Sequence, residues 1–238
     1  MSAAGAASGP ASGPGRRALV TGVSSGIGEA IARTLLSSGW TVDGISRSGA
    51  TGLTGDFHDH RIDLSDAVAA APRLAELPTP HAVVHAAGFM HAAALGALDL
   101  DVGARLWQLH VVASELLADS FSSRMAAGGR IVLIGSRTSR GAAGRSQYAA
   151  SKAALTGLAR SWAAELAPRG ITVNIVSPAA TDTPMLADPA RASVAPKLPP
   201  IGRLIRPQEV AATVAFLLSA DAAAITGQNI VICGGSSL

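Results

Sequence analysis

The sequence of 238 residues contains little cysteine, few aromatic residues and no long apolar run. Its single cysteine, Cys233, excludes an internal disulfide and any zinc site that is built from cysteines. Aromatic residues make up 3% of the chain and the basic residues do not cluster, which argues against a nucleic-acid partner. No apolar stretch approaches the length that crosses a bilayer, so we expect no membrane association.

Residues 1–15 are almost entirely Gly, Ala, Ser and Pro. They have neither the charged start nor the apolar stretch of a secretory signal peptide. We therefore predict a disordered N-terminal tail on a soluble, cytoplasmic protein.

A glycine-rich turn joins an apolar, strand-like run at residues 18–20 to a helical pattern that begins near Glu29. Its glycines, Gly22, Gly26 and Gly28, would let a phosphate group approach the main chain. The N-terminus of the following helix would offer unpaired N–H groups to that anion. A tight turn without a ligand is the alternative, but the strand-like residues 40–46 complete a β-α-β unit, which favours dinucleotide binding.

The residues after the second predicted strand indicate which dinucleotide binds. A carboxylate there bonds the ribose 2′-hydroxyl of NAD, whereas an arginine accommodates the 2′-phosphate of NADP. This chain has Ser46 and Arg47 at that point, and Asp43 lies too early in the strand to be the acid. We expect NADP(H) rather than NAD(H) as cofactor; an arginine that only aids solubility is the alternative.

Strand-like and helical patterns alternate over residues 16–238, which we predict to be one dinucleotide-binding catalytic domain. The predicted fold is α/β, a single Rossmann-type, doubly wound parallel sheet with helices on both faces. Helices are predicted at residues 29–38, 66–78, 99–127, 148–166 and 208–218. Residues 49–60 are predicted as a solvated loop, in which Asp56, His58, Asp59 and His60 lack the spacing of metal ligands, so we expect no metal site. Residues 179–203, rich in Pro and Ala, are predicted as a substrate lid.

Tyr148 and Lys152 are four residues apart on a predicted helix and therefore share a face. Ligands of open parallel sheets bind beyond the carboxyl ends of the strands, where Ser136 also falls. A free tyrosine has a pKa of about 10, and a neighbouring ammonium favours its phenolate. Tyr148 could thus exchange a proton with a carbonyl oxygen to which Ser136 donates a hydrogen bond.

Taken together, residues 21–28, Asp63, residues 85–88, Ser136 and residues 148–152 resemble the classical short-chain dehydrogenase/reductase family over about residues 16–238. The resemblance implies a nicotinamide cofactor, a homodimer or homotetramer, and Ser136, Tyr148 and Lys152 as catalytic residues. It also implies that Lys152 bonds the nicotinamide ribose and that Asp63 contacts the adenine. The cofactor contacts expected from all these observations are Gly22, Ser24, Ser25, Gly26, Ile27, Gly28, Ser46, Arg47, Asp63, Leu64, Ala86, Ala87, Gly88, Tyr148, Lys152, Pro178, Ala179, Thr181 and Thr183.

The chain departs from the family pattern at four places. His110 falls on the helix asparagine of the family's proton relay, so it is a candidate catalytic residue, with a packed core histidine as the alternative. His85 and Ala86 stand where two asparagines are usual, and Ala179 stands where glycine is usual. The loop between Ser136 and Tyr148 is one residue shorter than the family's commonest spacing, which leaves Ser139 as a second candidate for the catalytic serine.

The expected function is an NADP(H)-dependent ketoreductase that interconverts a ketone or aldehyde and an alcohol, with Tyr148 as proton donor and acceptor. The alternatives are an NAD-dependent secondary alcohol dehydrogenase and a non-catalytic dinucleotide-binding protein. The residues expected either to wall the substrate pocket or to pack in the core are Phe89, Met90, His91, Met185 and Leu186.

Overall fold

The computed structural model describes residues 16–187 and 197–238. The predicted N-terminal tail, residues 1–15, lies outside this part of the chain, as do residues 188–196 of the predicted lid.

Seven strands of the described chain form one sheet of order β3-β2-β1-β4-β5-β6-β7, and each hydrogen-bonded pair is parallel. The chain reverses direction across the sheet between β1 and β4, which is the switch point where such folds bind ligands. The prediction of a doubly wound parallel sheet is confirmed. The strands are β1 (Arg17–Thr21), β2 (Thr41–Ser46), β3 (Phe57–Arg61), β4 (Ala82–His85), β5 (Arg130–Ile134), β6 (Thr172–Pro178) and β7 (Asn229–Ile232).

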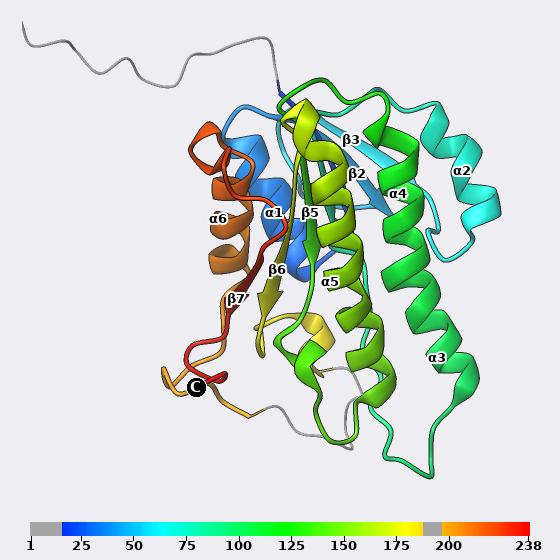
Figure 1. Cartoon of the computed structure of the whole chain (residues 1–238), viewed down its shortest axis with the longest axis vertical. Coiled ribbons are helices and arrows are strands. Elements are labelled where there is room, and N and C mark those ends of the chain that lie inside the picture. The colour runs from blue at the N-terminus through cyan, green and yellow to red at the C-terminus, as the bar shows by residue number, and fades with distance from the viewer. Residues whose placement is uncertain (1–15, 188–196) are drawn as a thin grey trace, which may run out of the picture.

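Helices cover both faces of the sheet (Figure 1): α1 and α6 pack together on one face, and α4 and α5 lie on the other with α2 beside α4. The helices are α1 (Gly26–Ser37), α2 (Ala67–Ala75), α3 (Leu100–Trp107), α4 (Ala113–Ser122), α5 (Ser146–Leu166) and α6 (Pro207–Leu217). Along β1, Ala18 and Val20 pack toward α1 and α6, while Leu19 packs toward α4 and α5. Burial on both faces explains the continuous apolar character of the central strands. None of the described helices is long and apolar enough to cross a membrane.

Residues 57–60, predicted as part of a solvated loop, instead belong to β3 (Phe57–Arg61), the edge strand paired with β2. The prediction is wrong here because an edge strand has one neighbour and lets polar side chains meet water, so its sequence lacks a buried face. The described residues hold no group of three or more side chains arranged as metal ligands.

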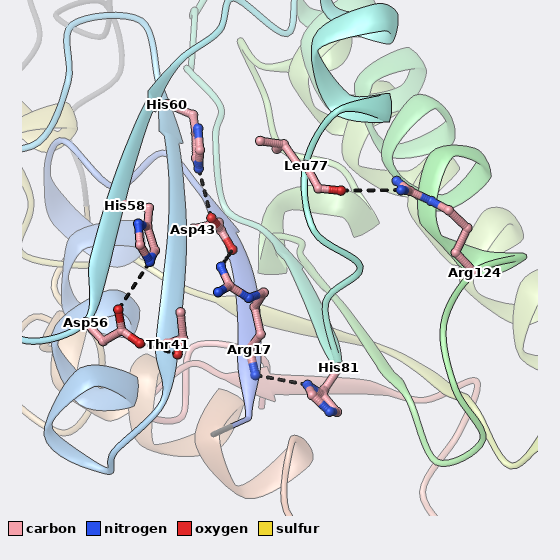
Figure 2. A network of polar contacts seen from close by, with 9 residues as sticks. All are labelled: Arg17, Thr41, Asp43, Asp56, His58, His60, Leu77, His81 and Arg124. Atoms are coloured by element: carbon pink, nitrogen blue, oxygen red, sulfur yellow. Dashed lines mark hydrogen bonds and ion pairs between the residues drawn. The ribbon is translucent and has the colours of Figure 1, made fainter. Parts of the chain in front are cut away.

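Asp43 of β2 ties β1 to β3 at this edge (Figure 2). Its buried carboxylate accepts a hydrogen bond from Arg17 Nη1 at 2.6 Å and lies 2.8 Å from His60 Nε2. Beside it, His58 Nε2 lies 3.1 Å from Asp56 Oδ1 (Figure 2). Asp43 therefore links the strands of the sheet, in agreement with its exclusion as a ribose-binding acid.

The predicted helix over residues 99–127 is divided in the structure. A π-helical turn, η1 (Gln108–Val112), separates α3 from α4, and α4 ends at Ser122. A π-helical turn is wider than an α-helical one and is often found at functional sites. The apolar spacing did not reveal it, because residues on either side of the turn still bury their side chains.

Candidate active site

A cavity of about 1130 Å³ opens at the carboxyl ends of the strands. All catalytic and cofactor residues expected from the sequence line it, including the glycine turn after β1, the ends of β2 and β4, and the first turns of α5. Ser139, the second candidate for the catalytic serine, is not among the residues that line this cavity. It borders a second, small cavity together with Arg140 and Asn229. The topology thus gathers residues that are far apart in the chain, as predicted.

The glycine turn brings the backbone of β1 against that of β4. Gly22 has φ +73°, and a Cβ there would lie 2.9 Å from the backbone nitrogen of Ala87. A Cβ on Gly28 would lie 2.3 Å from the carbonyl oxygen of Gly22, so α1 can start this close to the strand only with glycine at that position. Ser25, the N-cap residue of α1, forms no capping bond through its side chain, which leaves first-turn N–H groups for an anion.

A chain of hydrogen bonds behind the turn fixes the floor of the cavity. The Thr21 hydroxyl accepts bonds from the backbone N–H groups of Ala86 (3.0 Å) and Ala87 (2.9 Å), so its own hydrogen points to His85 Nδ1 at 2.9 Å. His85 Nε2 then donates to the carbonyl of Leu109 at 3.0 Å. Burial, and after it the charge of Lys152, lowers the pKa of His85 to about 4. His85 is therefore a neutral structural link between β1, β4 and η1.

Tyr148 and Lys152 are both buried in the first turns of α5, one helical turn apart. Lys152 Nζ donates a hydrogen bond to the carbonyl of Ile134 at 2.8 Å, and burial lowers the pKa of this lysine to about 7. Ser136 follows β5, is buried, and accepts a hydrogen bond from the backbone N–H of Thr138 at 3.1 Å. Since that bond uses the oxygen of Ser136, its hydroxyl hydrogen remains available to a group in the cavity.

His110 stands in η1 with its ring against the phenol of Tyr148, at a centroid separation of 5.6 Å and an interplanar angle of 84°. His110 Nδ1 lies 2.9 Å from the Ser151 hydroxyl, which in turn lies 2.9 Å from the carbonyl of Tyr148. By strict hydrogen-bond geometry Nε2 is buried without a partner among the described residues, while the backbone of Phe89 lies close enough to raise the pKa of the ring. Burial, followed by the charge of Lys152, holds the pKa of His110 well below 6.5.

The other end of the cavity holds Ser46, Arg47 and Asp63. The Ser46 hydroxyl is buried without a hydrogen-bond partner in the described part of the chain, although it lines the cavity. Arg47 beside it is exposed. The hydroxyl of Ser65, 2.7 Å from Asp63 Oδ1, lowers the pKa of Asp63 and keeps it ionised. This end therefore offers a neutral hydroxyl, a guanidinium and a carboxylate to a polar ligand.

Several lining residues were missed by the sequence interpretation. Of the five residues expected either to wall the pocket or to pack in the core, three line the cavity: Phe89, Met90 and Met185. His91 and Leu186 are not among its lining residues. Arg137 and Arg145, in the loop between Ser136 and Tyr148, were not considered as site residues. Their position between two candidate catalytic residues was the available signal.

Comparisons with known proteins place the chain among oxidoreductases. The family model described as enoyl-(acyl carrier protein) reductase matches residues 22–237. A 3-oxoacyl-(acyl-carrier-protein) reductase of Salmonella typhimurium is 35% identical over 240 residues, which cover 93% of this chain and 97% of the relative. The 2,3-dihydro-2,3-dihydroxybenzoate dehydrogenase of Escherichia coli is 35% identical over 243 residues, covering 94% and 98%. A short-chain dehydrogenase of Burkholderia cenocepacia, solved in complex with NADP, superposes with a TM-score of 0.84 at 34% identity, covering 94% and 98%.

The buried lysine should make the stability of the cofactor-free protein depend on pH. Between its folded pKa of about 7 and its unfolded value near 10.5, Lys152 binds a proton only in the unfolded state, so stability from this group rises with pH in that window. Lys152→Met removes this effect. From pH 7 to pH 9 the unfolding free energy of the parent should therefore gain about 2–3 kcal/mol relative to the variant in urea titrations. A constant difference between the two proteins over this range would contradict the burial of a titrating lysine.

Proposed function

The chain belongs to the classical short-chain dehydrogenase/reductase family, and from this premise we propose that it is an NADP(H)-dependent oxidoreductase interconverting a ketone or aldehyde and an alcohol. The observation that carries the proposal is the convergence of Tyr148, Lys152 and Ser136 on the wall of one cavity. The activities named for the two relatives fit it, since one concerns a 3-oxoacyl group and the other a cyclic diol. The expected homodimer or homotetramer remains a prediction.

The bound cofactor would supply or accept the hydride. For reduction, the Ser136 hydroxyl donates a hydrogen bond to the carbonyl oxygen and stabilises the negative charge that develops there. Tyr148 donates its phenolic proton to this oxygen, and the Lys152 ammonium stabilises the resulting phenolate. In oxidation the same groups act in reverse, with the Tyr148 phenolate taking the proton of the alcohol.

The residues at the glycine turn and at the end of β2 fit NADP(H). The N-terminus of α1 and the close approach allowed by Gly22 and Gly28 suit a pyrophosphate. The buried Ser46 hydroxyl and the neighbouring Arg47 suit a ribose 2′-phosphate, because a guanidinium binds phosphate bidentately. The neighbouring structure with bound NADP supports this choice.

His110 has the role of a positioning residue for Lys152. A Cβ built on Gly88 would lie 2.9 Å from His110 Nε2 and 3.7 Å from Lys152 Nζ, so both nitrogens face the same small space. The neutral ring occupies space beside the lysine and helps to keep water away from its ammonium group.

Tyr148→Phe should lower kcat by about a hundredfold to ten-thousandfold, because the proton donor is lost while the ring still packs against His110. NADPH binding, followed by nucleotide fluorescence, should persist. Retained turnover would disprove the role of Tyr148. Tight NADPH binding by the parent protein with no turnover of any carbonyl compound in a broad panel would favour the non-catalytic alternative.

Arg47→Ala should weaken NADPH binding by about tenfold to a hundredfold, the range expected for losing a charge-assisted hydrogen bond. NADH, which lacks the 2′-phosphate, should bind the parent and the variant with similar affinity. Isothermal titration of both nucleotides measures the two constants. An unchanged NADPH affinity would overturn the choice of cofactor and favour the NAD-dependent alternative.

His110→Ala should shift the alkaline limb of the kcat/KM profile for reduction to higher pH, because water entering the space of the imidazole relieves the desolvation that lowers the pKa of Lys152. His110→Gln, which refills much of that space, should give a smaller shift. A role in packing alone would lower the stability of both variants and leave the position of the limb unchanged, which would refute the assignment.

A further inference from the structure

The charge on the cavity wall is unevenly distributed. Asp63 is the one carboxylate among the described residues of the lining, and it follows β3 at the edge of the sheet. Beside Ser136 and Tyr148 in the chain, the charged residues of the described lining are basic: Arg137, Arg145 and Lys152. The end of the cavity where the carbonyl would react is therefore positive, and an anionic group there would be attracted.

Arg145 is held firmly next to the proton donor. It is the N-cap residue of α5, three positions before Tyr148, and its carbonyl accepts the bond from the backbone nitrogen of Ala149 at 2.8 Å. Its backbone also forms a bridge with Ala93. Its side chain is half-buried and lines the cavity. The guanidinium is thus positioned by the same helix start that positions Tyr148.

Arg137 lies directly after Ser136 and brings a second guanidinium to this end of the cavity. Its Nη1 donates to the carbonyl of Ser236 at 3.1 Å, which anchors the half-buried side chain. The two guanidinium groups interact electrostatically, because burial and then the charge of Arg137 lower the pKa of Arg145. Like charges at close range repel, and a bound anion would relieve that repulsion.

We propose that the carbonyl substrate is an oxo-carboxylate whose carboxylate is bound by Arg145 and Arg137. This inference rests on the proposed reaction at Tyr148 and names the substrate class for it. Because Arg145 is only three residues from Tyr148, the carboxylate would lie a few bonds from the reacting carbonyl. The planar guanidinium matches a carboxylate with two parallel hydrogen bonds, so the charge would orient the substrate as well as bind it.

The test compares each acid with its neutral ester. With NADPH, kcat/KM is measured for 3-oxocyclohexane-1-carboxylate and 4-oxopentanoate, and for the methyl ester of each. The parent should prefer the acids by at least about tenfold, and Arg145→Gln should reduce the acid-to-ester ratio by about tenfold to a hundredfold, with Arg137→Gln acting in the same direction. The ratio cancels any effect of the substitution on Tyr148 itself. The matched control is Arg140→Gln. Arg140 is an exposed arginine of the same loop and is not among the residues that line the large cavity, so this substitution should leave the ratio unchanged.

A binding measurement separates the two proposals. Cyclohexanecarboxylate and cyclohexanecarboxamide are titrated into the full chain with NADP+ present, and the acid should bind at least about tenfold more tightly, except in Arg145→Gln. Esters reduced as well as acids, or a preference for acids that survives both substitutions, would overturn the inference and leave the reaction standing. Arginine-dependent binding of the carboxylate without turnover of any probe would instead overturn the reaction and keep the anion site. The absence of both turnover and selective binding would overturn both proposals.

Discussion

The hydroxyl of Thr21 sets the distance between β1 and β4 at the switch point of the sheet. It accepts hydrogen bonds from two backbone N–H groups of the turn after β4 and directs its own hydrogen to His85, so the ends of the two strands cannot separate without breaking these three bonds. Gly22 can adjoin Ala87 only because it has no side chain. The floor of the cavity, and with it the place where a dinucleotide could lie, depends on this junction.

Burial assigns different charge states to the basic groups around the floor. His85 and His110 are neutral because burial and the charge of Lys152 lower the pKa of each. Lys152, also buried, titrates near neutral pH. Positive charge beside Tyr148 therefore comes from Lys152 and the arginines of the neighbouring loop, while the two histidines add no charge.

Much of the fold and of the site wall could be predicted from the sequence, because central strands, glycine turns and a tyrosine-lysine pair leave local patterns. The edge strand β3 left no such pattern, since its polar side chains meet water and its pairing with β2 uses only the backbone. The role of His85 was also hidden: its partners Thr21 and Leu109 lie 64 and 24 residues away. The two arginines of the cavity could not be placed, because an irregular loop has no periodicity that says where its side chains point.

The π-helical turn η1 has a consequence for how this helix tolerates insertions and deletions. Leu106, before the turn, belongs to the cluster around Tyr148, whereas Leu117 and Phe121, after it, belong to the core under the sheet. One residue advances an α-helix by about 100°. Deleting one residue from α3 or α4 would therefore rotate one segment against the other, whereas deleting one from the wider π-helical turn would make the turn α-helical and leave both segments nearly in register. The turn is thus the place where this helix can lose a residue while Leu106 and Leu117 each keep their cluster.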